Sequence, residues 1–240
     1  MKLSDYIAEI LLKNEINTVF GIIGSANAHL FDSFYFKEEI NLICMHHEQA
    51  CVMAAHGYYM QSGKIAAVLA TAGAGTTNLL TGVVGAWADS VPVLIITGQE
   101  ATKQFKNKNI TRMIGIQGVF TESIFNSCTK RVKTCQSSEE VKIELNKSLK
   151  LIKSDRYGPC IVDIPIDLQG SNIDIKNGEI KNYIKSRDNE DSKVNSKEIH
   201  NLISDINNSN KPLLWLGNGL RGMDPEKLRK IIIEINIPYL

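Results

Sequence analysis

Short apolar runs alternate with longer segments of helical periodicity along most of the chain. Residues 40–45, 64–70 and 92–99 are apolar at nearly every position, which is typical of strands that are buried on both faces. Residues 158–165 form a further run of this kind, and Leu3, Ile7, Ile10 and Leu11 give the first segment an apolar helical stripe. This alternation predicts an α/β fold with a doubly wound parallel sheet flanked by helices.

Composition predicts two domains and a linker. Residues 1–168 carry the strands and helices of the first domain, whereas residues 169–195 are rich in Asn, Lys, Asp, Glu and Ser and are predicted to link it to the next. Residues 196–240 begin a second α/β domain, with a strand at 213–219 and Asp224-Pro225 starting a helix. Its 45 residues are fewer than an independent core usually needs. We therefore interpret the chain as the N-terminal piece of a longer enzyme or as a truncated reading frame.

Charge and cysteine content narrow the class of protein. The formal net charge is +1, which indicates neither a nucleic-acid surface nor an anionic-membrane surface. The five cysteines contain no Cys-x-x-Cys pair, which favours reduced thiols and a cytoplasmic location. No apolar run approaches the length of a membrane span, and the polar N-terminus differs from a secretory signal.

Glu48 is the first candidate for chemistry. It stands between the apolar run 40–45 and a helix predicted over residues 49–58. A carboxylate buried at such a joint needs a partner that takes a proton or a hydrogen bond. The alternative is that Glu48 only caps the helix, because helix N-termini favour carboxylates.

The segment from Gly73 to Asn78 lies between the run 64–70 and a helix predicted to reach Ala88. A Gly-x-Gly turn at this position can hold a phosphate, but the dinucleotide fingerprint requires a third glycine where Asn78 stands. The P-loop requires a Gly-Lys-Ser/Thr sequence that is missing here. A purely structural tight turn remains an alternative.

The segment from His46 to His56 also resembles a metal site. His46, His47, Cys51 and His56 crowd one predicted helix start, and His47-Glu48 begins like a zinc-protease His-Glu-x-x-His motif. The second histidine of that motif is absent, and no downstream Cys-x-x-Cys supplies a deaminase site. We predict no metal ligands in this segment, and His46 and His56 are interpreted as packing residues.

Several motifs in order resemble the pyrimidine-binding domain of thiamine-diphosphate enzymes, in particular the acetolactate synthase large-subunit group. The resemblance covers roughly the first 170 residues continuously and weakens after them. The motifs are Val19-Phe20-Gly21 with Gly24, His47-Glu48-Gln49-Ala50, Ala55-His56-Gly57-Tyr58, Gly73-Ala74-Gly75-Thr76-Thr77-Asn78, Ala88-Asp89-Ser90-Val91-Pro92 and Thr97-Gly98-Gln99.

The resemblance implies roles for individual residues. The carboxylate matching Glu48 hydrogen-bonds N1′ of the cofactor's aminopyrimidine and is the catalytic group; the cofactor carries the difficult chemistry and the protein orients it. Other residues are implied to contact the cofactor or the substrate. For the cofactor they are Gly24, Ser25, Gly73, Ala74 and Asn78, and for the substrate they are Gln117, His47 and Gln99.

The resemblance also implies cofactors and partners. It implies thiamine diphosphate and Mg²⁺, but no Gly-Asp-Gly followed by Asn-Asn supplies ligands for magnesium and diphosphate here. Whether FAD binds stays open. The expected substrate is a 2-oxo acid such as pyruvate, and the expected assembly is a homodimer or tetramer.

Departures from the family pattern leave the reaction open. Ile22-Ile23-Gly24-Ser25 stands where acetolactate synthases commonly have Tyr-Pro-Gly-Gly, and Ile116-Gln117-Gly118 stands where they have Phe-Gln-Glu. An acetolactate-synthase-like carboligase is the favoured interpretation. The alternatives are another thiamine-diphosphate 2-oxo-acid decarboxylase and a fragment without catalytic activity.

Overall fold

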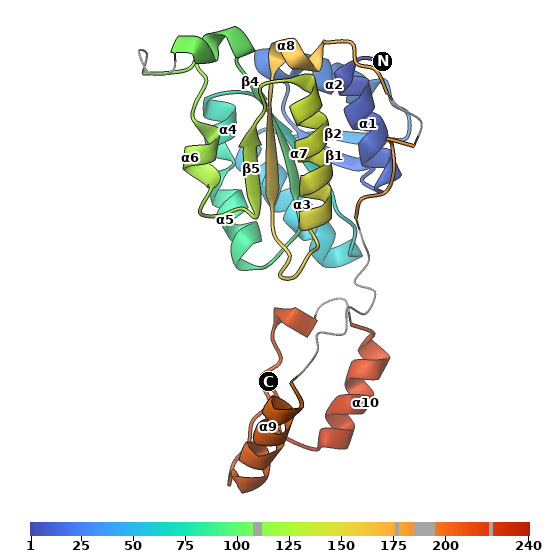
Figure 1. The fold of residues 1–240 in the computed structure, drawn as a ribbon. Coiled ribbons are helices and arrows are strands. Elements are labelled where there is room, and N and C mark those ends of the chain that lie inside the picture. Colours follow the sequence, from blue (N-terminus) through green and yellow to red (C-terminus); the bar gives the residue numbers. More distant parts are fainter. Residues whose placement is uncertain (108–111, 176–177, 185–194, 221–222) are drawn as a thin grey trace. The chain divides into compact units, whose positions relative to one another are not determined.

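The computed structural model describes residues 1–107, 112–175, 178–184, 195–220 and 223–240. The chain divides into two compact units, Met1–Ser186 and Arg187–Leu240. Figure 1 shows helices on both sides of a sheet in the first unit.

The first unit is built on six parallel strands, which confirms the predicted fold class. The sheet order is β2-β1-β3-β4-β6-β5, and every neighbouring pair is parallel. The strands are β1 (Thr18–Gly21), β2 (Asn41–Cys44), β3 (Ala67–Ala70), β4 (Leu94–Gln99), β5 (Arg131–Thr134) and β6 (Cys160–Pro165). Every residue of β3, β4 and β6 is buried, because helices cover both faces of the sheet.

The helices follow the predicted alternation. They are α1 (Leu3–Lys13), α2 (Ala28–Tyr35), α3 (Glu48–Ser62), α4 (Ala74–Asn78), α5 (Leu80–Ala88), α6 (Thr121–Phe125), α7 (Ser138–Leu151) and α8 (Ile166–Gln169), with 3₁₀ turns η1 (Ser25–Asn27) and η2 (Thr102–Asn107). The helix predicted to reach Ala88 is two helices, which meet at Leu79.

Strand β5 was not among the predicted strands. Its sequence is Arg-Val-Lys-Thr, and all four of its residues are only half-buried, because it pairs on one side only as an edge strand. Charged residues are usual on such edges, so the sequence lacks the apolar run that marks the buried strands.

Part of the predicted linker packs on the first unit. The Asn14 Oδ1 atom accepts hydrogen bonds from the backbone of Tyr183 and Ile184, at 2.6 and 3.1 Å, and Tyr183 is buried. Leu3 N donates to Ser171 O at 2.9 Å. A polar composition does not reveal this packing, because backbone groups of the linker pair with groups that are distant in the chain.

The second unit contains a β-α-β arrangement. Leu214 and Tyr239 form a parallel bridge, and helix α10 (Pro225–Ile235) lies between them in the chain. The Asp224 side chain caps α10 with Pro225 at its start, as predicted, and α9 (Ser196–Asn208) precedes it. The predicted strand at 213–219 is only this single-residue bridge, followed by η3 (Asn218–Leu220).

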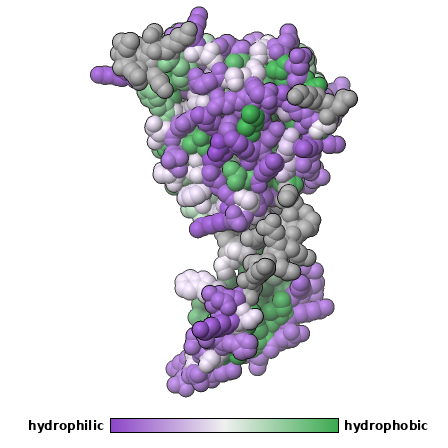
Figure 2. Space-filling model, in the orientation of Figure 1, coloured by the Kyte–Doolittle hydropathy of each residue, from purple (hydrophilic) through white to green (hydrophobic). Residues whose placement is uncertain are grey.

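No described side chain of residues 195–240 is buried. Figure 2 accordingly shows hydrophobic surface on the second unit, whereas the visible face of the first unit is mainly hydrophilic. None of the helices in the described ranges is long and apolar enough to cross a membrane.

Candidate functional site

The candidate site lies at the carboxyl ends of β1 and β3. From β1 the chain proceeds outward to β2, whereas from β3 it proceeds in the opposite direction to β4. The strand order therefore reverses between β1 and β3, and open parallel sheets bind ligands in the crevice at such a reversal. Gly24 follows β1, Thr71 and Gly73 follow β3, and Glu48 follows β2.

Glu48 is the first residue of α3 and is only 9% exposed. Its Oε2 atom accepts a hydrogen bond of 3.0 Å from the Asn78 side chain at the end of α4. Its Oε1 atom lies against Gly75, where an added Cβ would stand 3.2 Å away. The structure thus joins Glu48 and Asn78, two predicted site residues 30 positions apart in the chain.

His47 is the N-cap of α3. Its Nδ1 atom accepts a hydrogen bond of 3.2 Å from Gln49 N, and the side chain is exposed. A side-chain cap is therefore already supplied by His47, and the Glu48 carboxylate is directed to Asn78. Glu48 also lies in the first turn of α3, so both alternatives for this carboxylate stay predictions.

Gly73 has no room for a side chain. Its φ of 69° lies in the left-handed region, and an added Cβ would collide with the backbone oxygen of Gln117. Gly73 and Gln117 are 44 residues apart, so the glycine turn and the segment around Gln117 form one surface.

Thr71 joins the loops after β1 and β3. An added Cβ on Gly24 would stand 2.6 Å from the Thr71 side chain, and one on Gly75 would stand 2.8 Å from it. Thr71 Oγ1 accepts a hydrogen bond of 3.2 Å from Ala26 N. Because Gly24 and Gly75 have no side chains, Thr71 fits between them and connects the loop after β1 with the loop after β3. Thr71 is not among the predicted site residues, because its only signal in the sequence is its place directly after an apolar strand.

Ser25 and Ala74 lie at the open side of these loops. Both side chains are exposed, Ser25 at the start of η1 and Ala74 at the start of α4. The turn before η1 is fixed by Asn27, whose side chain accepts from Gly24 N at 2.7 Å and donates to Ile22 O at 3.0 Å. The small loop residues leave the backbone open to a flat ligand.

Gln99 is fully buried beneath this edge rather than exposed on it. Its Nε2 atom donates to Asp163 Oδ2 at 2.9 Å and to Val119 O at 3.0 Å, and its Oε1 atom accepts from Glu100 N at 3.0 Å. Both ends of the Gln99 amide are therefore engaged within the protein.

Asp163, which is not among the predicted site residues, is the hydrogen-bond partner of Gln99 beneath this edge. It is fully buried, and burial raises its pKa to about 6 despite hydrogen bonds from Thr97, Gln99 and Thr134. Its signal was a charged residue in the middle of the apolar run 158–165. Such a residue is expensive to bury without partners.

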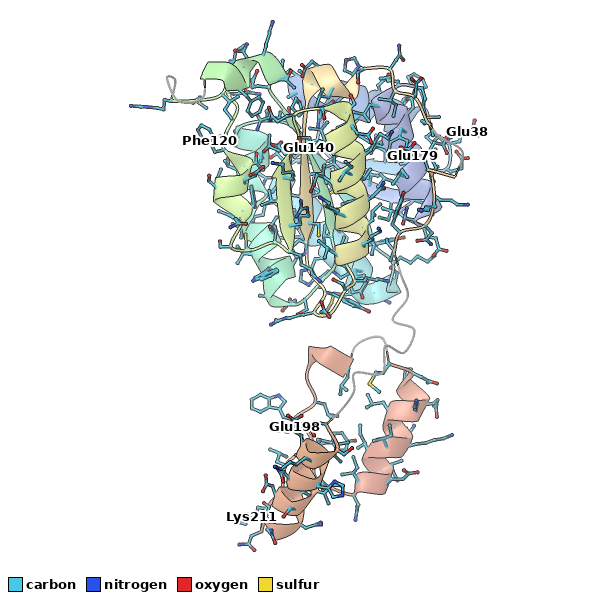
Figure 3. The ribbon with its side chains drawn as sticks, viewed as in Figure 1. Glu38, Phe120, Glu140, Glu179, Glu198 and Lys211 are labelled. Atoms are coloured by element: carbon cyan, nitrogen blue, oxygen red, sulfur yellow. The ribbon has the colours of Figure 1, made fainter. Side chains whose placement is uncertain are left out.

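Gln117 is half-buried in a turn closed by hydrogen bonds between the backbones of Ile114 and Gly118, at 2.8 and 3.1 Å. Gln117 N donates to Glu100 Oε1 at 3.1 Å. Ile116 is 90% exposed at the tip, and Phe120, labelled in Figure 3, is also exposed just before α6. The turn and the residue that precedes α6 therefore expose apolar side chains, and the turn lies beside Gly73.

The histidines and cysteines near α3 are engaged in other ways. His56 Nε2 lies 3.3 Å from Asp89 Oδ2. Burial, with the nearby Glu48 carboxylate, raises the pKa of Cys51 to about 12, so Cys51 remains a thiol. Within the described ranges, no group of three His, Cys, Asp or Glu side chains could hold a metal ion.

A protein-family match and two curated relatives show what this chain is similar to. Residues 1–127 match the family described as "Thiamine pyrophosphate enzyme, N-terminal TPP binding domain". The chain is 31% identical to the acetolactate synthase isozyme 2 large subunit of Escherichia coli, covering 90% of this chain and 37% of that protein. It is also 31% identical to a probable acetolactate synthase large subunit of Methanococcus aeolicus, covering 96% and 38%. The chain thus spans less than two fifths of the length of these two relatives.

A solved structure shares the fold. A thiamine diphosphate-dependent 4-hydroxybenzoylformate decarboxylase of Rhodococcus jostii superposes with a TM-score of 0.78 at 19% identity, covering 92% of this chain and 40% of that one. At this identity the similarity extends to the fold alone.

Proposed function

The chain belongs to the thiamine pyrophosphate enzymes, and on that premise we propose that residues 1–168 bind the aminopyrimidine half of thiamine diphosphate in a 2-oxo-acid decarboxylase or carboligase similar to acetolactate synthase. The observation that carries the proposal is the buried Glu48 carboxylate, held by Asn78 at the reversal of the strand order. When bound, the cofactor supplies the nucleophilic carbon that attacks the 2-oxo acid.

Glu48 is the proton-sharing group of this proposal. A carboxylate with little access to water can hold a proton in a hydrogen bond to a ring nitrogen, here N1′ of the aminopyrimidine. Asn78 supports that role, because its amide occupies Oε2 and restricts the rotation of the carboxylate. The protein thus orients one acid–base group toward one atom of the ring.

The glycine loop supplies the flat surface. Gly73 and Gly75 carry no side chain between the backbone and the space beside Glu48, and Thr71 locks the loop against Gly24. This arrangement supports the aminopyrimidine rather than a diphosphate as the ligand of this loop, because the negative Glu48 carboxylate lies beside it and would repel a phosphate.

The described residues do not fit a magnesium site. No group of three His, Cys, Asp or Glu side chains in them could hold a metal ion. We therefore assign none of the described residues to Mg²⁺.

We further propose that the active protein is a homodimer or tetramer in the cytoplasm. Helices α3 and α5 contact each other, and both expose apolar side chains. The exposed residues are Met53, Met60, Leu80, Val84 and Trp87. A second copy of the chain would remove these side chains from water. Sedimentation velocity tests this: a monomer at every concentration would refute it.

The experiment that tests the main proposal follows deuterium exchange at the cofactor's C2 carbon by NMR, in the enzyme that carries this sequence. Glu48→Gln should slow the exchange strongly, because an amide cannot share the proton with N1′. Exchange at the unmodified rate would show that Glu48 has another role.

A further inference from the structure

Three neighbouring strands converge on one buried carboxylate. Asp163 in β6 is in register with Thr97 in β4 and with Thr134 in β5. Thr97 Oγ1 donates to Asp163 Oδ1 at 2.7 Å, and Thr134 Oγ1 donates to Asp163 Oδ2 at 2.8 Å. Gln99, two residues after Thr97 and on the same face of β4, donates to Oδ2 at 2.9 Å. Two hydroxyls and an amide therefore satisfy the carboxylate inside the sheet edge.

The carboxylate determines how the Gln99 amide is oriented. Burial raises the pKa of Asp163 to about 6, so at neutral pH it is ionised and can only accept hydrogen bonds. The NH₂ group of Gln99 must then face Asp163 and Val119 O, which directs the Gln99 oxygen to Glu100 N. A neutral side chain at position 163 that could also donate would remove this constraint on the amide.

Gln99 in turn supports the turn of residues 114–118. Gly118 lies so close to the Gln99 oxygen that an added Cβ would stand 2.5 Å from it and 2.8 Å from Glu100 Cγ. The Glu100 carboxylate accepts from Gln117 N at 3.1 Å. The backbone oxygen of Gln117 then lies against Gly73 of the glycine loop.

We propose that Asp163 is a positioning residue, which holds the turn 114–118 against Gly73 by fixing the Gln99 amide and, through it, Glu100. The contacts run from β6 through β4 to the loop that carries the proposed aminopyrimidine surface. The importance of the turn for catalysis rests on the proposed function, whereas the contacts themselves do not.

Amide hydrogen exchange of the 240-residue chain without cofactor tests the proposal. Asp163→Asn should speed exchange of the Gln117 and Gly118 amides about 10-fold or more. The substitution replaces the charged acceptor of the Gln99 amide, so Gln99 should no longer hold the turn in place. Gln99→Leu should do the same while it leaves the Thr97 and Thr134 bonds to Asp163 in place. This second variant keeps the test valid if the Asp163 variant does not fold.

Thr134→Val is the matched control, because it removes one bond to the same carboxylate without touching Gln99. It should change the exchange of the turn amides less than about 3-fold, and the amides of α1 and α7 should keep their protection in every folded variant. If Thr134→Val loosens the turn as much as Asp163→Asn does, Asp163 supports the sheet edge in general and the proposal is wrong.

A double variant gives a sharper criterion. Glu100→Gln weakens the acceptor of Gln117 N directly, so its effect on the turn and that of Asp163→Asn should not multiply. The double variant should exchange about as fast as the faster single variant. Fully multiplicative effects would show that the two residues act independently and would overturn the proposal. Because no cofactor is present, either result is independent of whether the chain binds thiamine diphosphate.

Discussion

Glu48→Gln should separate folding from catalysis. The substitution keeps the shape of the side chain but replaces its charge, so Asn78 can still donate to an amide oxygen at this position. A hydrogen bond to a charged group contributes about 1.5–3 kcal/mol and one between neutral groups about 0.5–1.5 kcal/mol. The free energy of unfolding should therefore fall by only about 1 kcal/mol.

The rate effect should be much larger. Loss of a general acid–base group typically slows a reaction about 10²–10⁴-fold, or about 2.7–5.5 kcal/mol of activation free energy. Deuterium exchange at the cofactor's C2 carbon measures this step directly, and urea unfolding measures the stability. The two numbers should differ by a factor of at least two.

Glu38→Gln is the control for this experiment. Glu38→Gln makes the same chemical change ten residues upstream of Glu48. The Glu38 side chain is exposed and is labelled in Figure 3. It should alter neither the exchange rate nor the stability by more than about 0.5 kcal/mol. If Glu48→Gln exchanged as fast as Glu38→Gln, or if its rate loss merely matched its loss of stability, the assignment of Glu48 would fail.

Four further predictions concern other parts of the chain. Gly73→Ala should lower the free energy of unfolding by about 2 kcal/mol or more, because Gly73 has a positive φ and an added Cβ would collide with Gln117 O. Gly85→Ala should raise it by about 0.5–1 kcal/mol, because Gly85 lies within α5 and an added Cβ would meet no other atom. Urea unfolding of both variants tests the contrast. The folded pKa of Asp163, about 6, exceeds its ordinary value of 3.8, so ionisation of Asp163 should lower the free energy of unfolding as pH rises from about 4 to 6. A pKa difference of about 2 corresponds to a loss of about 3 kcal/mol. Asp163→Asn should abolish that part of the pH dependence in urea unfolding, and an unchanged slope would contradict the prediction. Gln117→Ala should change 2-oxo-acid turnover or products more than cofactor affinity in steady-state assays, and a change in cofactor dissociation alone would place Gln117 elsewhere. The 240-residue chain by itself should bind thiamine diphosphate weakly in calorimetry and show no pyruvate decarboxylation, since its described residues offer no metal site for the diphosphate; micromolar binding with turnover would be the contrary result.

The helices and strands of the first unit that carry strong periodicity could be predicted from the sequence. The apolar runs 40–45, 64–70 and 92–99 are local signals, and each contains a strand of the parallel sheet, namely β2, β3 and β4. The start of α10 at Asp224-Pro225 was predictable for the same reason, since capping depends on neighbouring residues only. The edge strand β5 was not predictable in this way, because its residues are half-buried and polar.

For the candidate site, too, some features have local signals in the sequence and others depend on contacts between distant residues. The sequence by itself determined that a carboxylate stands at a strand–helix joint and that a glycine loop follows the next strand, because both are facts of local order along the chain. Only the tertiary structure decided that Asn78 holds Glu48, that Thr71 fills the space left by Gly24, and that Gln99 is buried on Asp163 rather than exposed to a substrate. These pairs are separated by 30 to 64 residues in the chain. Their contacts depend on the strand order and register of the sheet, which bring distant segments to one edge, and no local pattern of hydrophobic and polar residues specifies which side chains then meet.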